Sequence, residues 1–336
     1  MYESFRTLST LAVFGTLMGA GVACERPERG QAPVSASPAT RNAAPASSLA
    51  AVSASVPGTA APDSKTPVPS AVEPSKEPPI EAELHVPKSA AKTDRLPLVL
   101  LLHGLGASAE ALAEHTDWAA FAEKARFAWL SPNGPKDHLG RRFWNASDAC
   151  CNFDRVKVDH VRGLGELLKR TVAGGRIDPE RVFVVGYSNG GFMAHRLACE
   201  LPAGAVRGIV SLAGAGPLAA VACTPQPSLR VLQVHGDADK AVAYAGGPIF
   251  GNAGWPVHPS AEKTVADWAA RLGCKRSTAP IAALDFDAKL AGAETSVERF
   301  TRCAPALVEL WTIRGGAHNI GLHSPSQEAI WKFLND

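Results

Sequence analysis

The sequence predicts an α/β fold with a mostly parallel central sheet that is covered by helices on both faces. Strand-like and helix-like stretches alternate along the chain, which is typical of this class. The strand-like runs are apolar throughout, without the in-and-out alternation of a half-solvated sheet, as expected when both faces are buried. One of these runs leads through a Gly-x-Ser-x-Gly turn straight into a helix-like stretch.

The individual elements follow from the periodicity of apolar residues. The expected strands, in chain order, are Leu96–Leu102, Phe127–Leu130, Val182–Val185, Gly208–Leu212, Leu229–Val234 and Leu307–Ile313. Apolar residues at helical spacing mark the expected helices Ala109–Ala125, Val158–Val172, Asn189–Glu200, Ala261–Leu272 and Gln327–Leu334. The stretch 241–259 is rich in Gly and Pro and is expected to form an irregular loop.

The most informative segment is Gly186-Tyr187-Ser188-Asn189-Gly190, which follows a buried strand and opens a helix. A serine at such a turn, with glycines at both flanking positions, has the pattern of a nucleophile elbow. The glycines are needed because a Cβ there would collide with the neighbouring strand and helix. A helix N-terminus also favours negative charge that develops at the serine. Ser188 is therefore the predicted nucleophile of an α/β-hydrolase fold.

A nucleophilic serine needs a base and a carboxylate that orients it, and in this fold the acid and then the histidine follow the serine along the chain. The strand ending at Val234 leads into a segment with two acids, Asp237 and Asp239. Both acids lie where parallel strands end, which is where such sheets build sites. From the residues alone Asp239 and Asp237 are both candidates for the acid, and Asp237 could instead cap or brace the turn.

The predicted base is His318, which follows the last strand and a Gly-Gly pair. His323, five residues later, is the alternative. Two backbone N–H groups are expected to hold the oxyanion, one from Asn189 and one from Leu105 in the loop after the first strand. Residues 104–109 also match a degenerate dinucleotide fingerprint, but the next strand ends without the acid that would hold a ribose.

Composition limits the classes of function. The chain has 336 residues, 46% of them hydrophobic, and a net charge of +2. It is long enough for one sizeable core, and the near-neutral charge offers no electrostatic case for binding nucleic acid.

The N-terminal part predicts export. Residues 1–24 have the pattern of a signal peptide, with Arg6 ahead of an apolar stretch that ends at Cys24. A partial lipobox at Cys24 leaves lipid anchoring and simple cleavage with secretion both open, and a retained membrane helix is disfavoured by the short apolar run. Residues 25–79, rich in Ala, Pro and Ser, are expected to be a disordered tether, and residues 80–336 the single folded domain.

The cysteine count agrees with export. Beyond Cys24 there are six cysteines, an even number that suggests disulfides in an exported protein. Pairing of the adjacent Cys150 and Cys151 is disfavoured as strained, and the sequence does not choose among the other connectivities. A metal site is disfavoured because neither Cys-x-x-Cys nor His-Glu-x-x-His spacing occurs.

Several motifs in a fixed order resemble the exported esterases grouped as poly(3-hydroxybutyrate) depolymerase-like and feruloyl or acetylxylan esterases, in carbohydrate esterase family 1. The resemblance covers residues 96–333. Its carriers are Leu102-His103-Gly104, Ser131-Pro132-Asn133-Gly134, Trp144-Asn145-Ala146 with Cys150-Cys151, Ile177-Asp178-Pro179-Glu180-Arg181-Val182, Gly186–Gly191, Val234–Asp239 and Gly315–His318. It implies Ser188 as nucleophile, Asp239 as acid and His318 as base. The segments Val158–Val161, Val242–Tyr244 and Asn319-Ile320 depart from the family pattern and leave the substrate open.

The expected activity is hydrolysis of a carboxylic ester through an acyl-serine intermediate, without a metal or organic cofactor. Candidate substrates are polyhydroxyalkanoate-type polyesters or oligomers and feruloyl or acetyl esters of polysaccharides. Trp144, Tyr187 and Trp255 are candidate substrate-binding residues, although buried tryptophans more often belong to the core. An exported peptidase and a non-catalytic, polymer-binding surface lipoprotein are the alternative functions, and the oligomeric state is left open.

Overall fold

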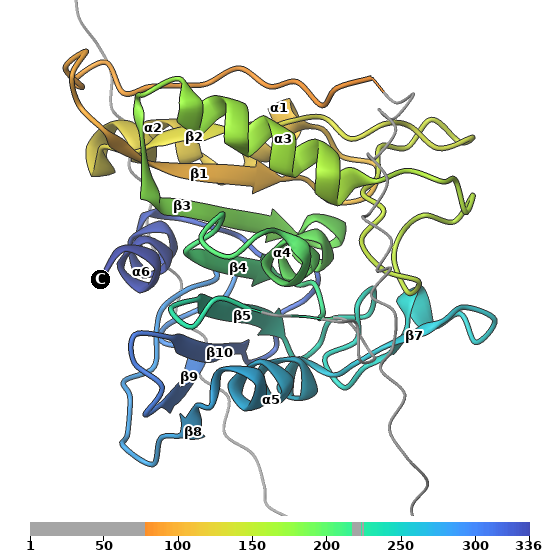
Figure 1. Cartoon of the computed structure of the whole chain (residues 1–336). Helices are drawn as coiled ribbons and strands as arrows, with labels where there is room; N and C mark the ends of the chain where they lie inside the picture. The colour runs from red at the N-terminus through yellow and green to blue at the C-terminus, as the bar shows by residue number, and fades with distance from the viewer. Residues whose placement is uncertain (1–77, 217–222, 224) are drawn as a thin grey trace, which may run out of the picture. The chain divides into compact units, whose positions relative to one another are not determined.

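The computed structural model describes residues 78–216, 223 and 225–336, and its centre is an eight-stranded sheet in the order β2-β1-β3-β4-β5-β10-β9-β8 (Figure 1). Six strands run parallel from β2 to β10, and β9 and β8 complete the sheet in antiparallel pairing. The bounds are β1 Leu96–Leu102, β2 Ala128–Leu130, β3 Ile177–Tyr187, β4 Gly208–Leu212, β5 Arg230–Gly236, β8 Lys275–Arg276, β9 Thr295–Thr301 and β10 Leu307–Ile313.

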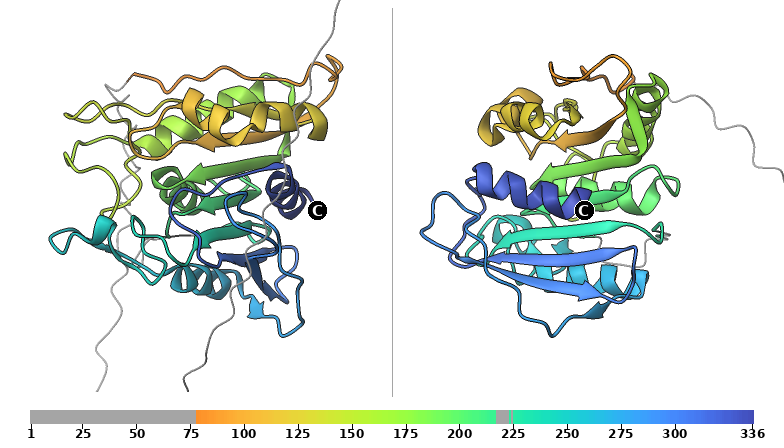
Figure 2. Two further views of the ribbon diagram at one scale, coloured as in Figure 1. Left: turned by 180° about the vertical axis from the view of Figure 1, so that it is seen from behind. Right: turned by 90° about the vertical axis from the view of Figure 1, so that its left-hand side faces the viewer.

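Helices cover both faces of this sheet (Figures 1 and 2). One face carries α1 Ala109–Thr116, α2 Trp118–Ala125 and α6 Ser324–Asn335, and the other carries α3 His160–Ala173, α4 Asn189–Glu200 and α5 Ala261–Leu272. Successive strand residues point to opposite faces, so Leu98 and Leu100 pack toward α3 and α4, and Val99 and Leu101 toward α1 and α2. All seven residues of β1 are buried, which confirms the predicted α/β class with helices on both sides.

The main differences from the sequence-based prediction lie at irregular backbone and at the sheet edge. The single helix expected over 109–125 is two helices, because Asp117 between them has a left-handed backbone with φ 47°. Strand β9 was not predicted: its residues are mostly partly exposed and include charged side chains, as suits a strand near the edge of the sheet. The loop 241–259 contains a short antiparallel pair, β6 Gly247–Pro248 with β7 Val257–His258, on either side of the 3₁₀ turn Ile249–Gly251.

Three disulfides join the six cysteines: Cys150–Cys151, Cys199–Cys223 and Cys274–Cys303. The expectation that the adjacent Cys150 and Cys151 would not pair was wrong. The peptide bond between them is cis, and their Cα atoms lie 3.1 Å apart. Both cysteines are buried in a tight turn, where the N–H of Ser147 donates to the carbonyl of Cys150 at 2.9 Å. The Cys150–Cys151 disulfide therefore depends on the conformation of this turn, which cannot be predicted from the spacing of apolar residues.

The Cys274–Cys303 disulfide ties the end of α5 to the loop after β9, across a sequence separation of 29 residues. Closing a loop of this size restricts the unfolded chain and stabilises the fold by about 3–4 kcal/mol. We expect the double variant Cys274→Ser/Cys303→Ser to lose about that much unfolding free energy in urea titrations. A double variant as stable as the wild type would contradict a stabilising role for this disulfide.

The predicted signal peptide and, apart from Pro78 and Pro79, the predicted tether lie outside the described residues. In the part of the chain that the structure describes, no helix has the length and apolar character needed to span a membrane.

Candidate active site

Ser188 lies at the sharp turn between β3 and α4, with a left-handed backbone at φ 52° and ψ −116°. Its N–H donates to the carbonyl of Leu212 on the neighbouring strand β4 at 2.7 Å, which fixes the turn against the sheet. A Cβ at Gly186 would collide with the carbonyl of Gly190, and a Cβ at Gly190 would collide with the carbonyl of Leu102. Both flanking positions therefore require glycine because backbone passes directly over them.

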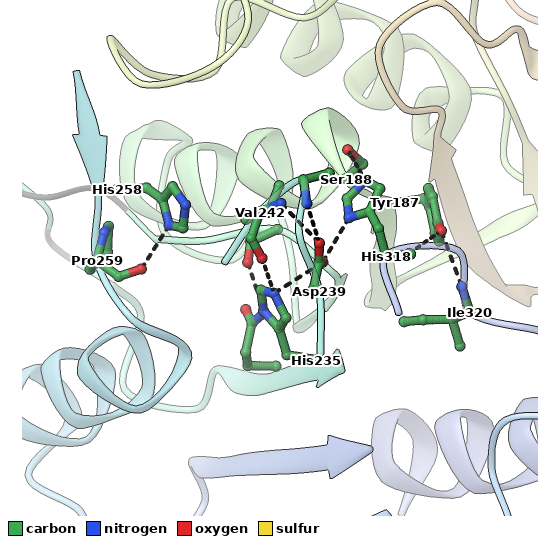
Figure 3. Close-up of polar contacts among 12 residues, drawn as sticks. Tyr187, Ser188, His235, Asp239, Val242, His258, Pro259, His318 and Ile320 are labelled. Atoms are coloured by element: carbon green, nitrogen blue, oxygen red, sulfur yellow. Dashed lines mark hydrogen bonds and ion pairs between the residues drawn. The ribbon is translucent and has the colours of Figure 1, made fainter. Parts of the chain in front are cut away.

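The structure brings three side chains from separate loops together at this turn (Figure 3). The hydroxyl of Ser188 lies 3.0 Å from Nε2 of His318, and Nδ1 of His318 lies 2.7 Å from Oδ2 of Asp239. His318 is about one quarter exposed, whereas the carboxylate of Asp239 is fully buried. The three predicted residues thus form one hydrogen-bonded series, with the serine at its solvent-accessible end.

The carboxylate of Asp239 is surrounded by donors. Oδ1 accepts the N–H groups of Ala241 at 2.8 Å and Val242 at 2.9 Å, and Oδ2 also lies 3.3 Å from Nε2 of His235. Burial alone would raise the pKa of Asp239, but the contacts with His235 and His318 outweigh burial and hold that pKa well below its usual range. The carboxylate is therefore ionised at neutral pH and can stabilise a protonated His318.

The two alternative residues lie in other contacts. Oδ1 of Asp237 accepts the N–H of Gly315 at 2.7 Å and so braces the loop that carries His318. His323 precedes α6 and hydrogen-bonds with Ser326 at 3.0 Å. The geometry thus favours Asp239 and His318 over these neighbours.

The loop after β1 lies against the serine turn, where the oxyanion was expected to bind. A Cβ at Gly104 would lie 3.3 Å from the Cβ of Ser188. His103 holds this loop through its two ring nitrogens: Nδ1 donates to the carbonyl of Gly104 at 2.8 Å, and Nε2 accepts the N–H of Gly134 at 3.0 Å. Within the described residues, neither the N–H of Leu105 nor that of Asn189 donates to another protein group.

Trp144 supports this loop from inside the core. Its side chain is fully buried, and its Nε1 donates to the carbonyl of His103 at 3.0 Å. The side-chain amide of Asn189 bonds with the backbone of Trp144 in both directions, at 2.6 and 3.0 Å. The expectation that Trp144 contacts substrate is therefore corrected. Its ring has no exposed surface, so it packs in the core, and it anchors the backbone near the serine.

The other two candidate substrate-binding residues differ from one another. The hydroxyl of Tyr187 donates to the carbonyl of His318 at 2.5 Å and accepts the N–H of Ile320 at 3.2 Å, so it holds the loop that carries the histidine. Trp255 is half-buried in the 241–259 loop, where it packs against Phe153 with ring centroids 4.5 Å apart. Of the three, Trp255 alone combines an aromatic surface with partial exposure and no hydrogen bond to the serine–histidine loops.

Two buried histidines make the fold sensitive to acid. Burial lowers the pKa of His160 to about 4, with the charge of Arg196 acting in the same direction, and burial lowers the pKa of His195 to about 4. The unfolded chain takes up these protons near pH 6.5, and the folded chain only near pH 4, so stability falls as pH drops through that window. Over this pH window each histidine lowers the free energy of unfolding by about 3 kcal/mol at most.

We expect the urea unfolding free energy to fall between pH 7 and pH 4.5, and to fall less in a His160→Gln variant. Glutamine can still accept the N–H of Asn145 that now donates to Nδ1 of His160 at 2.8 Å, but it does not titrate. An identical pH dependence in the wild type and the variant would contradict this assignment.

One contact of the site was missed in the sequence analysis. The contact between His235 and Asp239 was not predicted, although the spacing of four residues between them is a signal that could have paired the two. Among the residues that the structure describes, no three His, Cys, Asp or Glu side chains are grouped so that they could hold a metal ion.

Comparisons with known proteins identify the family and the fold of the chain. The phospholipase/carboxylesterase family model matches residues 86–253, which is half of the chain. The chain is 25% identical to feruloyl esterase B of Piromyces equi over 238 residues, covering 67% of this chain and 40% of the relative. It is 33% identical to poly(3-hydroxyalkanoate) depolymerase C of Paucimonas lemoignei over 141 residues, covering 40% of this chain and 30% of the relative. The match thus spans less than half the length of these curated relatives.

Among solved structures, the acetyl xylan esterase from Aspergillus awamori superposes with a TM-score of 0.53 at 14% identity. The superposition covers 75% of this chain and 93% of that one. At this level of identity the likeness is one of fold, and it agrees with the mostly parallel sheet covered by helices.

Proposed function

Because the chain belongs to the phospholipase/carboxylesterase family and has an α/β-hydrolase fold, we propose that it hydrolyses carboxylic esters through an acyl intermediate on Ser188. The observation that carries the proposal is the hydrogen-bonded series from the hydroxyl of Ser188 to His318 and Asp239, with links of 3.0 and 2.7 Å. This is the arrangement that lets a neutral serine act as a nucleophile.

In the proposed reaction, Nε2 of His318 accepts the hydroxyl proton of Ser188 as Oγ attacks the ester carbonyl carbon. The N–H groups of Leu105 and Asn189 stabilise the resulting oxyanion. His318 then donates the proton to the alkoxide leaving group, which departs as the alcohol. Nε2 of His318 then takes a proton from a water molecule as its oxygen attacks the acyl carbon. When the bond to Oγ of Ser188 breaks, the histidine returns that proton to Oγ, which releases the carboxylic acid and the free enzyme.

Asp239 completes the proposed mechanism without taking the proton itself. Its ionised carboxylate faces Nδ1–H of His318, which leaves Nε2 as the acceptor for the serine proton. The same charge stabilises the imidazolium that forms during attack. Tyr187, through its bonds to the backbone of the histidine loop, holds the ring at the required place.

We infer that the substrate carries an apolar or aromatic group. Trp255 packs with Phe153 and lies near Phe250, which is 59% exposed. The loop of Trp255 continues into β7, which lies on the side of the sheet where β3 and β5 end (Figure 1). Feruloyl esters, polyhydroxyalkanoate oligomers and acetylated polysaccharides are the classes to compare. Export to an oxidising compartment is part of the proposal, supported by the three disulfides.

A hydrolysis panel tests the function. The purified protein should release product from p-nitrophenyl esters, and the rates with methyl ferulate, hydroxybutyrate oligomers and acetylated xylan would identify the preferred class. The matched p-nitroanilide of the best acyl group should be hydrolysed far more slowly, since a peptidase would show the opposite preference. Absence of hydrolysis across all esters would overturn the proposal.

A further inference from the structure

A row of buried polar side chains leads from α5 through the core to the acid of the site. Nε1 of Trp268 on α5 lies 2.9 Å from Nδ1 of His195 on α4, and Nε2 of that histidine lies 2.9 Å from Oε1 of Gln233 on β5. Nε2 of Gln233 lies 3.1 Å from Nδ1 of His235, whose own Nε2 is 3.3 Å from Asp239. Each of these side chains is nearly or fully buried.

The chemistry of the first member fixes the direction of every hydrogen bond in this row. An indole N–H can only donate, so Nδ1 of His195 must be the acceptor. His195 is neutral because burial lowers its pKa to about 4, and its single proton therefore resides on Nε2. That proton is donated to Oε1 of Gln233, which sets the orientation of the amide. The amide NH₂ then donates to the carbonyl of Gly214 at 2.9 Å and to Nδ1 of His235.

His235 is thereby held with its proton on Nε2, the nitrogen that faces the turn carrying the acid (Figure 3). Nε2 donates to the carbonyl of Val242 at 2.7 Å and lies 3.3 Å from Oδ2 of Asp239. The same carboxylate accepts the N–H of Val242 through Oδ1 at 2.9 Å. One imidazole thus contacts both ends of the 239–242 turn, while the carboxylate closes the turn from within.

We propose that His235 is a positioning residue for Asp239, and that Trp268, His195 and Gln233 fix the proton of His235 on the nitrogen that faces the acid. This inference rests on the proposed function, because it assigns a task to the acid of the hydrolytic series. The proton of His235 points at the turn, which leaves Oδ2 of Asp239 in place to accept Nδ1–H of His318. With the opposite tautomer, a lone pair of His235 would face both the carbonyl of Val242 and the carboxylate, and the turn would be repelled.

A matched pair of substitutions tests the positioning role. His235→Met keeps the bulk of the side chain but removes the N–H donor, and His235→Gln keeps a neutral donor near the position of Nε2. We expect His235→Met to lower kcat by about 10–100-fold with KM within about twofold, since a small misplacement of a supporting group costs this much. His235→Gln should recover most of that loss.

His85 lies outside this row and stacks on Trp129, with ring centroids 4.0 Å apart. It supplies the control variant His85→Met, whose kcat and KM should match those of the wild type. The thermal midpoint of each variant, measured in parallel, separates a kinetic effect from unfolding. The inference is overturned if folded His235→Met has the wild-type kcat, or if His235→Gln loses as much as His235→Met.

A second measurement uses the unsubstituted protein and therefore does not depend on how the variants fold. Nitrogen NMR of protein labelled with ¹⁵N-histidine distinguishes which ring nitrogen holds the proton. We expect Nε2 to carry a proton and Nδ1 to be the acceptor in both His195 and His235. A proton on Nδ1 of either ring would overturn the inference.

Different results would overturn the proposed function and the positioning role of His235. Wild-type protein without activity on any ester would overturn the proposed function. An active wild type whose folded His235→Met variant turns over equally fast would overturn only the positioning role.

Discussion

Replacing Ser188 with alanine should lower kcat for ester hydrolysis by about 10⁴–10⁶-fold, because it removes the atom that forms the acyl intermediate. Residual turnover would come from the oxyanion donors and from substrate binding alone. The substitution removes one oxygen from a side chain that is partly solvent-exposed, so the turn and the sheet remain intact. KM should change little, and the thermal midpoint should stay within a few degrees of the wild type. Initial rates at saturating substrate measure the effect.

A serine outside the hydrogen-bonded series supplies the matched control. Ser296 lies on β9, near the edge of the sheet, where its hydroxyl makes one long contact of 3.5 Å with the carbonyl of Thr312. Ser296→Ala should retain full activity. Near-normal turnover by a folded Ser188→Ala variant would remove Ser188 from the mechanism.

Replacing Asp239 with asparagine should lower kcat by about 10⁴-fold, and the reason lies in the donors around the carboxylate. Two backbone N–H groups, from Ala241 and Val242, face Oδ1, so an asparagine would place its carbonyl oxygen there. Its NH₂ group would then face Nδ1 of His318 and donate to it. That hydrogen bond puts the imidazole proton on Nε2, where it blocks acceptance of the proton from Ser188.

The neighbouring acid provides the comparison for this substitution. Asp237 accepts an N–H from Gly315 but lies outside the hydrogen-bonded series, so Asp237→Asn, whose side-chain oxygen can still accept that N–H, should lower kcat by less than about tenfold. Equal losses in the two variants would contradict the assignment of Asp239. The rate profile of each variant over pH 6–9 would show in addition whether a base with a shifted pKa has replaced the wild-type one.

Local chemistry explains why the serine turn could be predicted from the sequence. Gly186 and Gly190 must be glycine because neighbouring backbone lies where a Cβ would be. The two glycines therefore occur at a fixed spacing from the serine, and this spacing can be recognised in the sequence. The loops carrying Asp239 and His318 follow apolar strands in an order typical of the fold. Parallel strands place both loops at one edge of the sheet, so their meeting with the serine follows from topology.

The features that escaped prediction depend on contacts between distant segments or on irregular backbone. Trp144 is buried because it packs beneath the loop after β1, a contact across 41 residues of sequence. The helix break at Asp117 and the Cys150–Cys151 pairing follow from single backbone conformations that apolar periodicity does not report. The row that ends at His235 joins α5, α4 and β5, and no local pattern links those three elements.

In the proposed mechanism Ser188 becomes covalently bonded to the substrate acyl group, so its reactivity can be measured by covalent labelling. After incubation with a fluorophosphonate, which reacts with activated serines, the protein can be digested and the adduct located by peptide mass spectrometry. The account predicts complete inactivation together with one adduct, on the peptide that contains Ser188. An inactivated enzyme with its adduct on another residue, or an enzyme that hydrolyses esters and resists the reagent, would contradict it.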